Sequence, residues 1–240
     1  MGKEWFRQWF DENYKLLYQH RDMKDAGHQV ELILNVVQPG RDWSILDLAC
    51  GEGRHSALFR DRGFDITGID LSKTLINSGR EKFPDLKLFE CDMRSIPGNY
   101  DMILSLFTSF GYFEEEKEDL KVISKIHSSL NSGGIFWLDL FNSEYIRNNL
   151  TVNKTEKIIN GVNITEEKRI VGDRIIKKIC FTSGSGYKEY NESVRLYSRD
   201  ELTKILNEHG FNIIDIFGDY LGSEWEINSK RSIYYCSKAE

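Results

Sequence analysis

Short apolar runs alternate with amphipathic segments over residues 40–145. Strands buried on both faces read as nearly continuous apolar runs, whereas a helix packed on a sheet repeats its apolar residues every three to four positions. Amphipathic segments, one starting near Arg54 and two spanning 72–83 and 114–130, therefore predict helices between buried parallel strands. The strands are expected at 44–48, 63–72, 86–94, 100–107 and 135–142.

The chain departs from this alternation at both ends. Residues 4–37 carry apolar positions at helical spacing in two pieces. Residues 150–197 instead alternate polar and apolar positions between glycine-containing turns, which predicts an antiparallel β insertion after the fifth strand. A helix from Ser198, which has a capping-box pattern, and two final strands at 213–217 and 232–237 complete the expected order.

The first strand leads into the segment Asp47-Leu-Ala-Cys-Gly51-Glu-Gly53. Glycines allow a tight turn and a close approach of the backbone to a ligand, and the following helix directs free amide groups into that turn. The second strand ends in Asp70, 19 positions after Gly51. A carboxylate there can accept hydrogen bonds from both hydroxyls of a ribose held over the first turn.

These two segments resemble the first two motifs of class I S-adenosylmethionine (SAM)-dependent methyltransferases. The resemblance implies a Rossmann-like α/β fold with a seven-stranded, mostly parallel sheet in the order 3-2-1-4-5-7-6, helices on both faces and an antiparallel last strand. It also implies SAM as cofactor and S-adenosylhomocysteine as product. Asp92 and Met93 match the position that binds adenine in the family. The cofactor-binding residues expected on this basis are Tyr18, Arg21, Asp47, Ala49, Cys50, Gly51, Gly53, His55, Asp70, Leu71, Ser72, Cys91, Asp92, Met93, Leu106 and Phe107.

We expect residues 1–240 to form a single methyltransferase domain. Within it, residues 1–38 resemble the helical lid of small-molecule methyltransferases, with Tyr14, Tyr18 or Arg21 reaching the methionine end of SAM. Residues 150–197 are expected to roof the acceptor site or to pair subunits. The protein is accordingly predicted to be a monomer or a homodimer formed through this insertion.

The expected reaction is methyl transfer to a nitrogen or oxygen atom of a small molecule. The segment 105–112 resembles that of small-molecule methyltransferases, including amino-sugar N,N-dimethyltransferases, and lacks the Asn/Asp-Pro-Pro-Tyr pattern of DNA and protein amine methyltransferases. Alignment of an acceptor about 3 Å behind the methyl carbon is the main requirement. Tyr112 and His55 are the predicted catalytic residues, with His20 and Asp139 as further candidates for a base, and no metal site is expected.

The amino-acid composition argues against several classes of partner and function. A net charge of −6 argues against a nucleic-acid partner, which usually requires a basic surface. Four scattered cysteines, the lack of a signal-peptide core and the lack of a long apolar run predict a cytoplasmic protein without a membrane span. A methyltransferase acting on tRNA or protein and a noncatalytic SAM-binding module remain the alternatives. An NAD-dependent oxidoreductase is disfavoured because residues 56 and 57 are not glycine.

Overall fold

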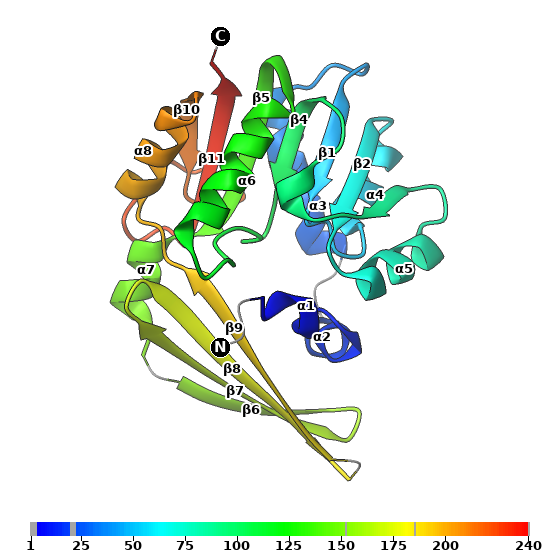
Figure 1. Ribbon diagram of the computed structural model, residues 1–240, viewed down its shortest axis with the longest axis vertical. Coiled ribbons are helices and arrows are strands. Elements are labelled where there is room, and N and C mark those ends of the chain that lie inside the picture. Colours follow the sequence, from blue (N-terminus) through cyan, green and yellow to red (C-terminus); the bar gives the residue numbers. More distant parts are fainter. Residues whose placement is uncertain (1–3, 20–22, 152, 185, 240) are drawn as a thin grey trace.

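A seven-stranded sheet forms the centre of the molecule. The computed structural model describes residues 4–19, 23–151, 153–184 and 186–239. The strands run in the order β10-β11-β5-β4-β1-β2-β3, and only β11 is antiparallel to both of its neighbours (Figure 1). Their bounds are β1 Ser44–Leu48, β2 Asp65–Asp70, β3 Lys87–Glu90, β4 Tyr100–Ser105, β5 Leu130–Phe141, β10 Phe211–Phe217 and β11 Arg231–Lys238.

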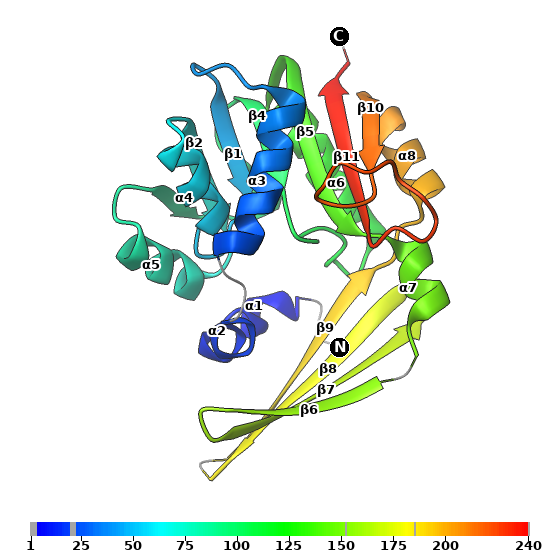
Figure 2. The same cartoon turned by 180° about the vertical axis from the view of Figure 1, so that it is seen from behind.

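Helices cover both faces of this sheet. The apolar sides of α6 (Glu116–Ser128) and α8 (Arg199–Glu208) pack on one face, in a core that includes Ile123 and Leu206. On the other face α3 (Met23–Val37) and α4 (Arg54–Asp61) pack through Ile33 and Phe59 (Figure 2). The helix α5 (Lys73–Lys82) lies beside β2 and β3, the short helix η1 (Met93–Ser95) follows β3, and α7 (Ser143–Asn149) follows β5.

The segment between α7 and α8 forms a separate antiparallel sheet. It consists of β6 (Asn153–Ile159), β7 (Val162–Val171), β8 (Arg174–Ser183) and β9 (Gly186–Arg195), paired in sequence order. The sheet extends away from the edge where the parallel strands end (Figures 1 and 2).

The N-terminal helices α1 (Phe6–Trp9) and α2 (Glu12–Tyr18) lie between the two sheets (Figure 1). Their residues Trp9 and Leu17 form an apolar cluster with Ile164, Ile179 and Phe181 of the insertion. Phe6 instead belongs to the core of the main sheet. The N-terminal segment is therefore packed against both parts of the molecule.

The predicted fold class, including the strand order and the antiparallel insertion, is confirmed. Two local predictions were wrong. The described residues of this segment, 4–19 and 23–37, form three helices, because Asp11 caps a new helix by accepting hydrogen bonds from the backbone of Asn13 and Tyr14. The strand expected from residue 135 begins at Leu130, since its first residues pair with β4 despite two glycines. None of the helices in the described ranges is long and apolar enough to cross a membrane.

Candidate active site

The loop between β1 and α4 turns through left-handed backbone. Ala49, Gly51 and Gly53 have φ values of 59°, 59° and 79°. A Cβ on Gly53 would lie 3.0 Å from a methyl carbon of Leu88, whereas a Cβ on Gly51 would meet only Leu75, at 3.9 Å. Glycine at position 53 thus serves packing, and glycine at position 51 leaves the backbone exposed to a ligand.

Asp70 holds the loop that follows β1 and the start of α5 together. Its Oδ2 accepts a hydrogen bond from Gly51 N at 2.9 Å, and its Oδ1 accepts one from Ser72 N at 2.7 Å. Burial raises the pKa of Asp70, and the two backbone donors partly oppose that shift. Each carboxylate oxygen has a second lone pair, so the residue can also accept the hydroxyls of a bound ribose.

Asp47 lies beneath the same loop and is almost fully buried. The hydroxyl of Ser56 donates to its Oδ2 at 2.7 Å. Burial raises the pKa of Asp47 to about 6, with the nearby charge of Asp70 adding to the effect. The residue joins the glycine loop to the first turn of α4.

Asp92 belongs to a cluster of charges that also includes the N-terminal segment. Its carboxylate accepts hydrogen bonds from the backbone and guanidinium of Arg94, and Arg94 also donates to Glu4 at 3.0 Å. Arg7 of α1 lies 3.5 Å from Asp92. Burial alone would raise the pKa of Asp92, but its hydrogen bonds to Arg94 lower it overall. Ion pairs thus link the segment at the end of β3 to the N-terminal segment.

Asp139 fixes a strained segment at the end of β4. Phe107 and Thr108 have φ values of 57° and 62°, which residues with side chains adopt at a cost of about 1–3 kcal/mol each. Asp139 accepts from Phe107 N and Tyr220 OH, both at 2.9 Å, and from Arg231 Nε at 2.8 Å. The Phe107 ring lies near two guanidinium groups, those of Arg54 and Arg231.

The two predicted catalytic residues have different surroundings. His55 is buried, its Nε2 lies 2.7 Å from Gln29 Oε1, and burial lowers its pKa to about 3. Such an imidazole is neutral and weakly basic. Tyr112 lies at the cavity between the rings of Trp5 and Phe10, at centroid distances of 5.2 and 6.1 Å.

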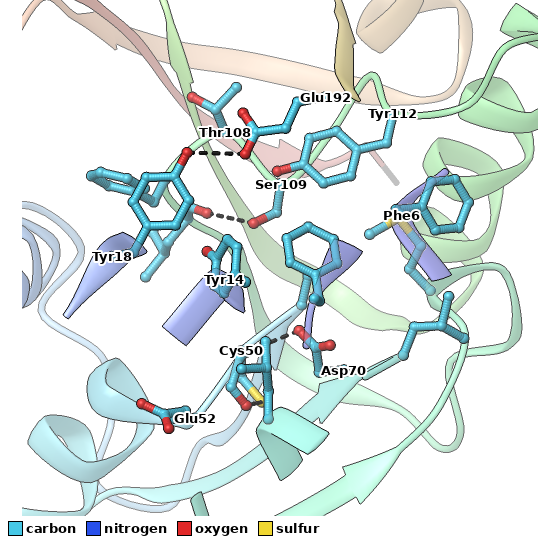
Figure 3. Close-up of a pocket in the computed structure, with 18 of the residues that line it drawn as sticks. Phe6, Tyr14, Tyr18, Cys50, Glu52, Asp70, Thr108, Ser109, Tyr112 and Glu192 are labelled. Carbon is cyan, nitrogen blue, oxygen red and sulfur yellow. Dashed lines mark hydrogen bonds between the residues drawn. The ribbon is translucent and has the colours of Figure 1, made fainter. Parts of the chain in front are cut away.

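These groups surround one cavity of about 850 Å³ (Figure 3). Its walls come from the carboxyl ends of the parallel strands, from α1 and α2, and from β7, β8 and β9 of the insertion. Figure 3 shows Asp70 and Cys50 on one side and Tyr18 and Glu192 on another. The predicted residues that line it are Tyr18, Asp47, Ala49, Cys50, Gly51, His55, Asp70, Leu71, Cys91, Asp92, Met93, Leu106, Phe107 and Tyr112.

Gly53 and Ser72 do not line the cavity but support its walls. Gly53 precedes the first residue of α4, and Ser72 caps α5 while its hydroxyl donates to Phe10 O at 2.6 Å. Arg21 and His20 lie outside the described residues.

Sequence reasoning missed the lining residues contributed by distant segments. Glu192, Lys177 and Arg231 line the cavity although each is far along the chain from the motifs at 47–53 and 70. Arg231 follows a polar loop and Glu192 lies in a strand that alternates polar and apolar residues, so neither had a local signal beyond its charge. Trp5 and Phe10, which are part of the apolar pattern of residues 4–37, also line the cavity.

The comparison with known proteins agrees with this geometry. A profile describing a methyltransferase domain matches residues 45–134. The chain is 29% identical over 185 residues to a glycine/sarcosine N-methyltransferase of Halorhodospira halochloris, covering 73% of this chain and 68% of that one. It is 31% identical over 94 residues to dTDP-3-amino-3,4,6-trideoxy-alpha-D-glucopyranose N,N-dimethyltransferase of Streptomyces venezuelae, covering 38% and 40%.

A solved structure shares the fold over nearly the whole chain. It is an S-adenosylmethionine-dependent methyltransferase from Clostridium acetobutylicum, with a TM-score of 0.80, 21% identity and coverage of 95% of this chain and 97% of that one. The matched domain contains the glycine loop, Asp70 and Asp92, whose arrangement the structure establishes. Residues 45–134 therefore match a methyltransferase domain, and the chain as a whole has the fold of S-adenosylmethionine-dependent methyltransferases.

Proposed function

We propose that the protein transfers the methyl group of SAM to the nitrogen of a small-molecule amine. The observation that carries this proposal is the single cavity, which has the glycine loop and Asp70 on one side and the insertion on another. Cover by both the N-terminal helices and the insertion favours a small acceptor over a macromolecule. The similarity to N-methyltransferases of glycine, sarcosine and an amino sugar favours nitrogen over oxygen.

The residues on the sheet edge fit the cofactor. Asp70 would bind the ribose hydroxyls, and Gly51, without a side chain, would let the cofactor approach the backbone. Asp92 and Met93 would border the adenine, next to the charged cluster of Arg94 and Glu4. SAM supplies, when bound, a methyl group on a sulfonium, which is already a good electrophile.

The chain's part in the reaction is then to orient the acceptor and exclude water. An acceptor needs little further activation when it is held in line with the breaking bond between the methyl carbon and the sulfur of SAM. His55 is a poor candidate for a general base, because burial lowers its pKa to about 3 and Gln29 occupies its Nε2. We assign it a structural role behind the glycine loop. Tyr112, whose position is set by the rings of Trp5 and Phe10, remains the candidate for contact with the acceptor.

Calorimetric titration with SAM, and separately with NAD, tests the cofactor assignment. Wild-type protein should bind SAM and not NAD, and Asp70→Ala should weaken SAM binding at least tenfold, about 1.4 kcal/mol. The matched control is Asp65→Ala at the exposed start of the same strand, which should bind SAM as the wild type does. Absence of SAM binding by folded wild-type protein would refute the proposal.

Conversion of SAM to S-adenosylhomocysteine, measured with paired small amines and alcohols, tests the acceptor. Turnover with at least one amine and none with the alcohols is expected. Turnover with tRNA or a protein alone would refute a small acceptor. SAM binding without turnover on any acceptor would favour the noncatalytic alternative.

A further inference from the structure

One carboxylate of the cavity stands apart from the others. The acids Asp47, Glu52, Asp70 and Asp92 line the cavity from the ends of the parallel strands and from the loops that follow them. Glu192 is the lining acid that β9 contributes in the part of the chain that the structure describes. Figure 3 places it beside Tyr18 and away from Asp70 and Cys50. Glu192 is therefore located where an acceptor, rather than the cofactor, would bind.

Two uncharged donors hold Glu192 in place, and its charge also interacts with the ammonium group of Lys177 on the neighbouring strand. Its Oε1 accepts hydrogen bonds from Trp9 Nε1 at 2.7 Å and from Tyr18 OH at 2.9 Å. Both donors are uncharged. Among the described residues, no Lys or Arg nitrogen forms an ion pair with Glu192, and Oε2 has no hydrogen-bond donor. One oxygen thus remains available to a ligand.

Three of the cations that line the same cavity, Arg231, Lys82 and Lys177, form ion pairs with other acids. Arg231 pairs with Asp139, and Lys82 pairs with Glu52. Lys177, the neighbour of Glu192 across the β8–β9 ladder, pairs with Glu166 and donates to Tyr18 OH at 2.7 Å. These pairs reduce the competition that a cationic ligand would meet at Glu192.

Five aromatic side chains that contact one another line the same cavity. We call them the aromatic belt: Trp5, Phe10, Tyr14, Tyr18 and Tyr112. Their rings are in contact, with centroids 4.7 Å apart for Tyr14 and Tyr18 and 4.8 Å apart for Phe10 and Tyr14. Aromatic faces attract ammonium groups by about 0.5–2 kcal/mol and also accommodate N-methyl groups. A carboxylate beside such rings is a recognition site for organic ammonium ions.

We propose that Glu192 and the aromatic belt bind the acceptor amine in its ammonium form, which makes Glu192 the residue that selects amines over alcohols. Before methyl transfer the ammonium gives one proton to the Glu192 carboxylate, which frees the nitrogen lone pair to form the bond to the methyl carbon as the bond from that carbon to the sulfur of SAM breaks. The inference rests on the proposed function. It adds to that function the charge state of the acceptor and the residue that recognises this charge. Small aliphatic or aromatic amines, which are cations near pH 7, are the ligands that this site fits.

The variant Glu192→Gln removes the charge while keeping the structure. Its side-chain carbonyl can still accept from Trp9 and Tyr18, so the contact between the N-terminal helices and β9 is preserved. The matched control is Glu189→Gln on the same strand. Glu189 is exposed, does not line the cavity, and pairs with Lys178. Equal melting temperatures of the two variants establish that the fold is intact.

Binding is measured by ligand-observed NMR at pH 7 with the site saturated by S-adenosylhomocysteine. The probes are three pairs of one skeleton: benzylamine and benzyl alcohol, cyclohexylamine and cyclohexanol, isobutylamine and isobutanol. In at least one pair the wild type and Glu189→Gln should bind the amine at least tenfold more tightly than the alcohol. Glu192→Gln should reduce that preference to less than twofold.

Two results would overturn the inference. One is a wild type that shows no preference for the amine in any pair, including no binding at all. The other is a preference that survives in Glu192→Gln. Titration of the same samples with SAM separates the two proposals: intact SAM binding without amine preference removes only the role of Glu192, whereas loss of SAM binding in the wild type removes the proposed function itself.

Discussion

His55 makes a specific contribution to the pH dependence of stability. Its pKa is about 3 in the folded protein and 6.5 in an exposed side chain, because burial disfavours the imidazolium. Between these values the unfolded chain binds a proton that the folded chain does not. Stability from this group is therefore complete above pH 6.5 and is lost as the pH falls, by up to about 1.4 kcal/mol per pH unit.

Urea unfolding at pH 7 and pH 5 checks this prediction in the wild type and in His55→Gln. The Gln side chain can still donate to Gln29 but does not titrate, so the variant should lose less stability on acidification. Asp47 and Asp119, whose pKa values burial raises to about 6, act in the opposite direction, but both proteins contain them. Identical losses in the two proteins would show that His55 does not govern the acid response.

Asp139 is predicted to be the most sensitive carboxylate of the site. Its side chain is 1% exposed and accepts hydrogen bonds from Phe107, Tyr220 and Arg231. Asp139→Asn would place an amide group against these donors and leave Arg231 without its anion, so the free energy of unfolding should fall by about 3 kcal/mol. Asp65→Asn, which breaks only the exposed pair with Lys87, should cost less than about 1 kcal/mol. Equal urea midpoints for the two variants would contradict this ranking.

The residues that could be predicted are those with a local signal. Gly51, Asp70 and Asp92 each follow an apolar strand at a characteristic distance, so the sequence places them at one edge of a sheet. Glu192 and Trp9 are 183 positions apart, and Asp139 and Arg231 are 92 apart. Such pairs depend on how distant elements pack, which the pattern of a single sequence does not encode. The sequence predicts that the insertion roofs the acceptor site or pairs subunits, but only the structure places Glu192 at the cavity.

The insertion is joined to the main domain through Arg174. Its guanidinium donates to the carbonyls of Phe113 at 2.9 Å and Gly111 at 3.0 Å, and to Ser193 Oγ at 2.7 Å. Arg174 thus fixes the segment that carries Tyr112 against β8 and β9. This contact explains how an antiparallel sheet outside the core can set the shape of the cavity.

Replacement of Arg174 tests this role at the level of the element. Arg174→Met removes the guanidinium donor from the carbonyls of 111–113, of which Phe113 O has no other donor among the described residues, so amide hydrogen exchange in a peptide covering 108–115 should become at least tenfold faster. Amide hydrogen exchange in a peptide covering 44–56, on the cofactor side of the cavity, should not change. Arg169→Met on the exposed part of β7 is the control and should resemble the wild type. Slow exchange in 108–115 of Arg174→Met would mean that other contacts fix the segment.

The sequence was sufficient to predict which segments form helices or strands, but less so to predict the residues at which these elements begin and end. Alternating residues and the turns at 160–161 and 172–173 were sufficient to predict the strands of the insertion, which the structure confirms. The break between α1 and α2 depends on the capping of Asp11, and β5 begins early because β4 pairs with it. Both boundaries result from hydrogen bonds that compete with the helix and strand propensities of the residues. Whether the insertion also pairs subunits stays a prediction.

For the whole molecule, the position of the cavity predicts a coupling between ligand binding and stability. The sheet edge, α1 and α2, and the insertion each form one wall, so a ligand bound there contacts all three. SAM at a hundredfold its dissociation constant should stabilise the folded state by about 2.7 kcal/mol. For a chain of this size the melting temperature should rise by about 5–10 °C in one cooperative transition.

Calorimetry of the full chain with and without SAM measures this rise. NAD at the same concentration should produce none. In Asp70→Asn the rise should fall to about half, because a tenfold weaker ligand at the same concentration contributes only about 1.4 kcal/mol. A melt with two transitions, of which SAM shifts only one, would contradict the coupling: it would mean that the insertion folds independently of the cofactor site. A single shifted transition would instead indicate that the acceptor and cofactor sides of the cavity form one folding unit, as expected if the N-terminal helices connect them through the Glu192–Trp9 and Glu4–Arg94 contacts.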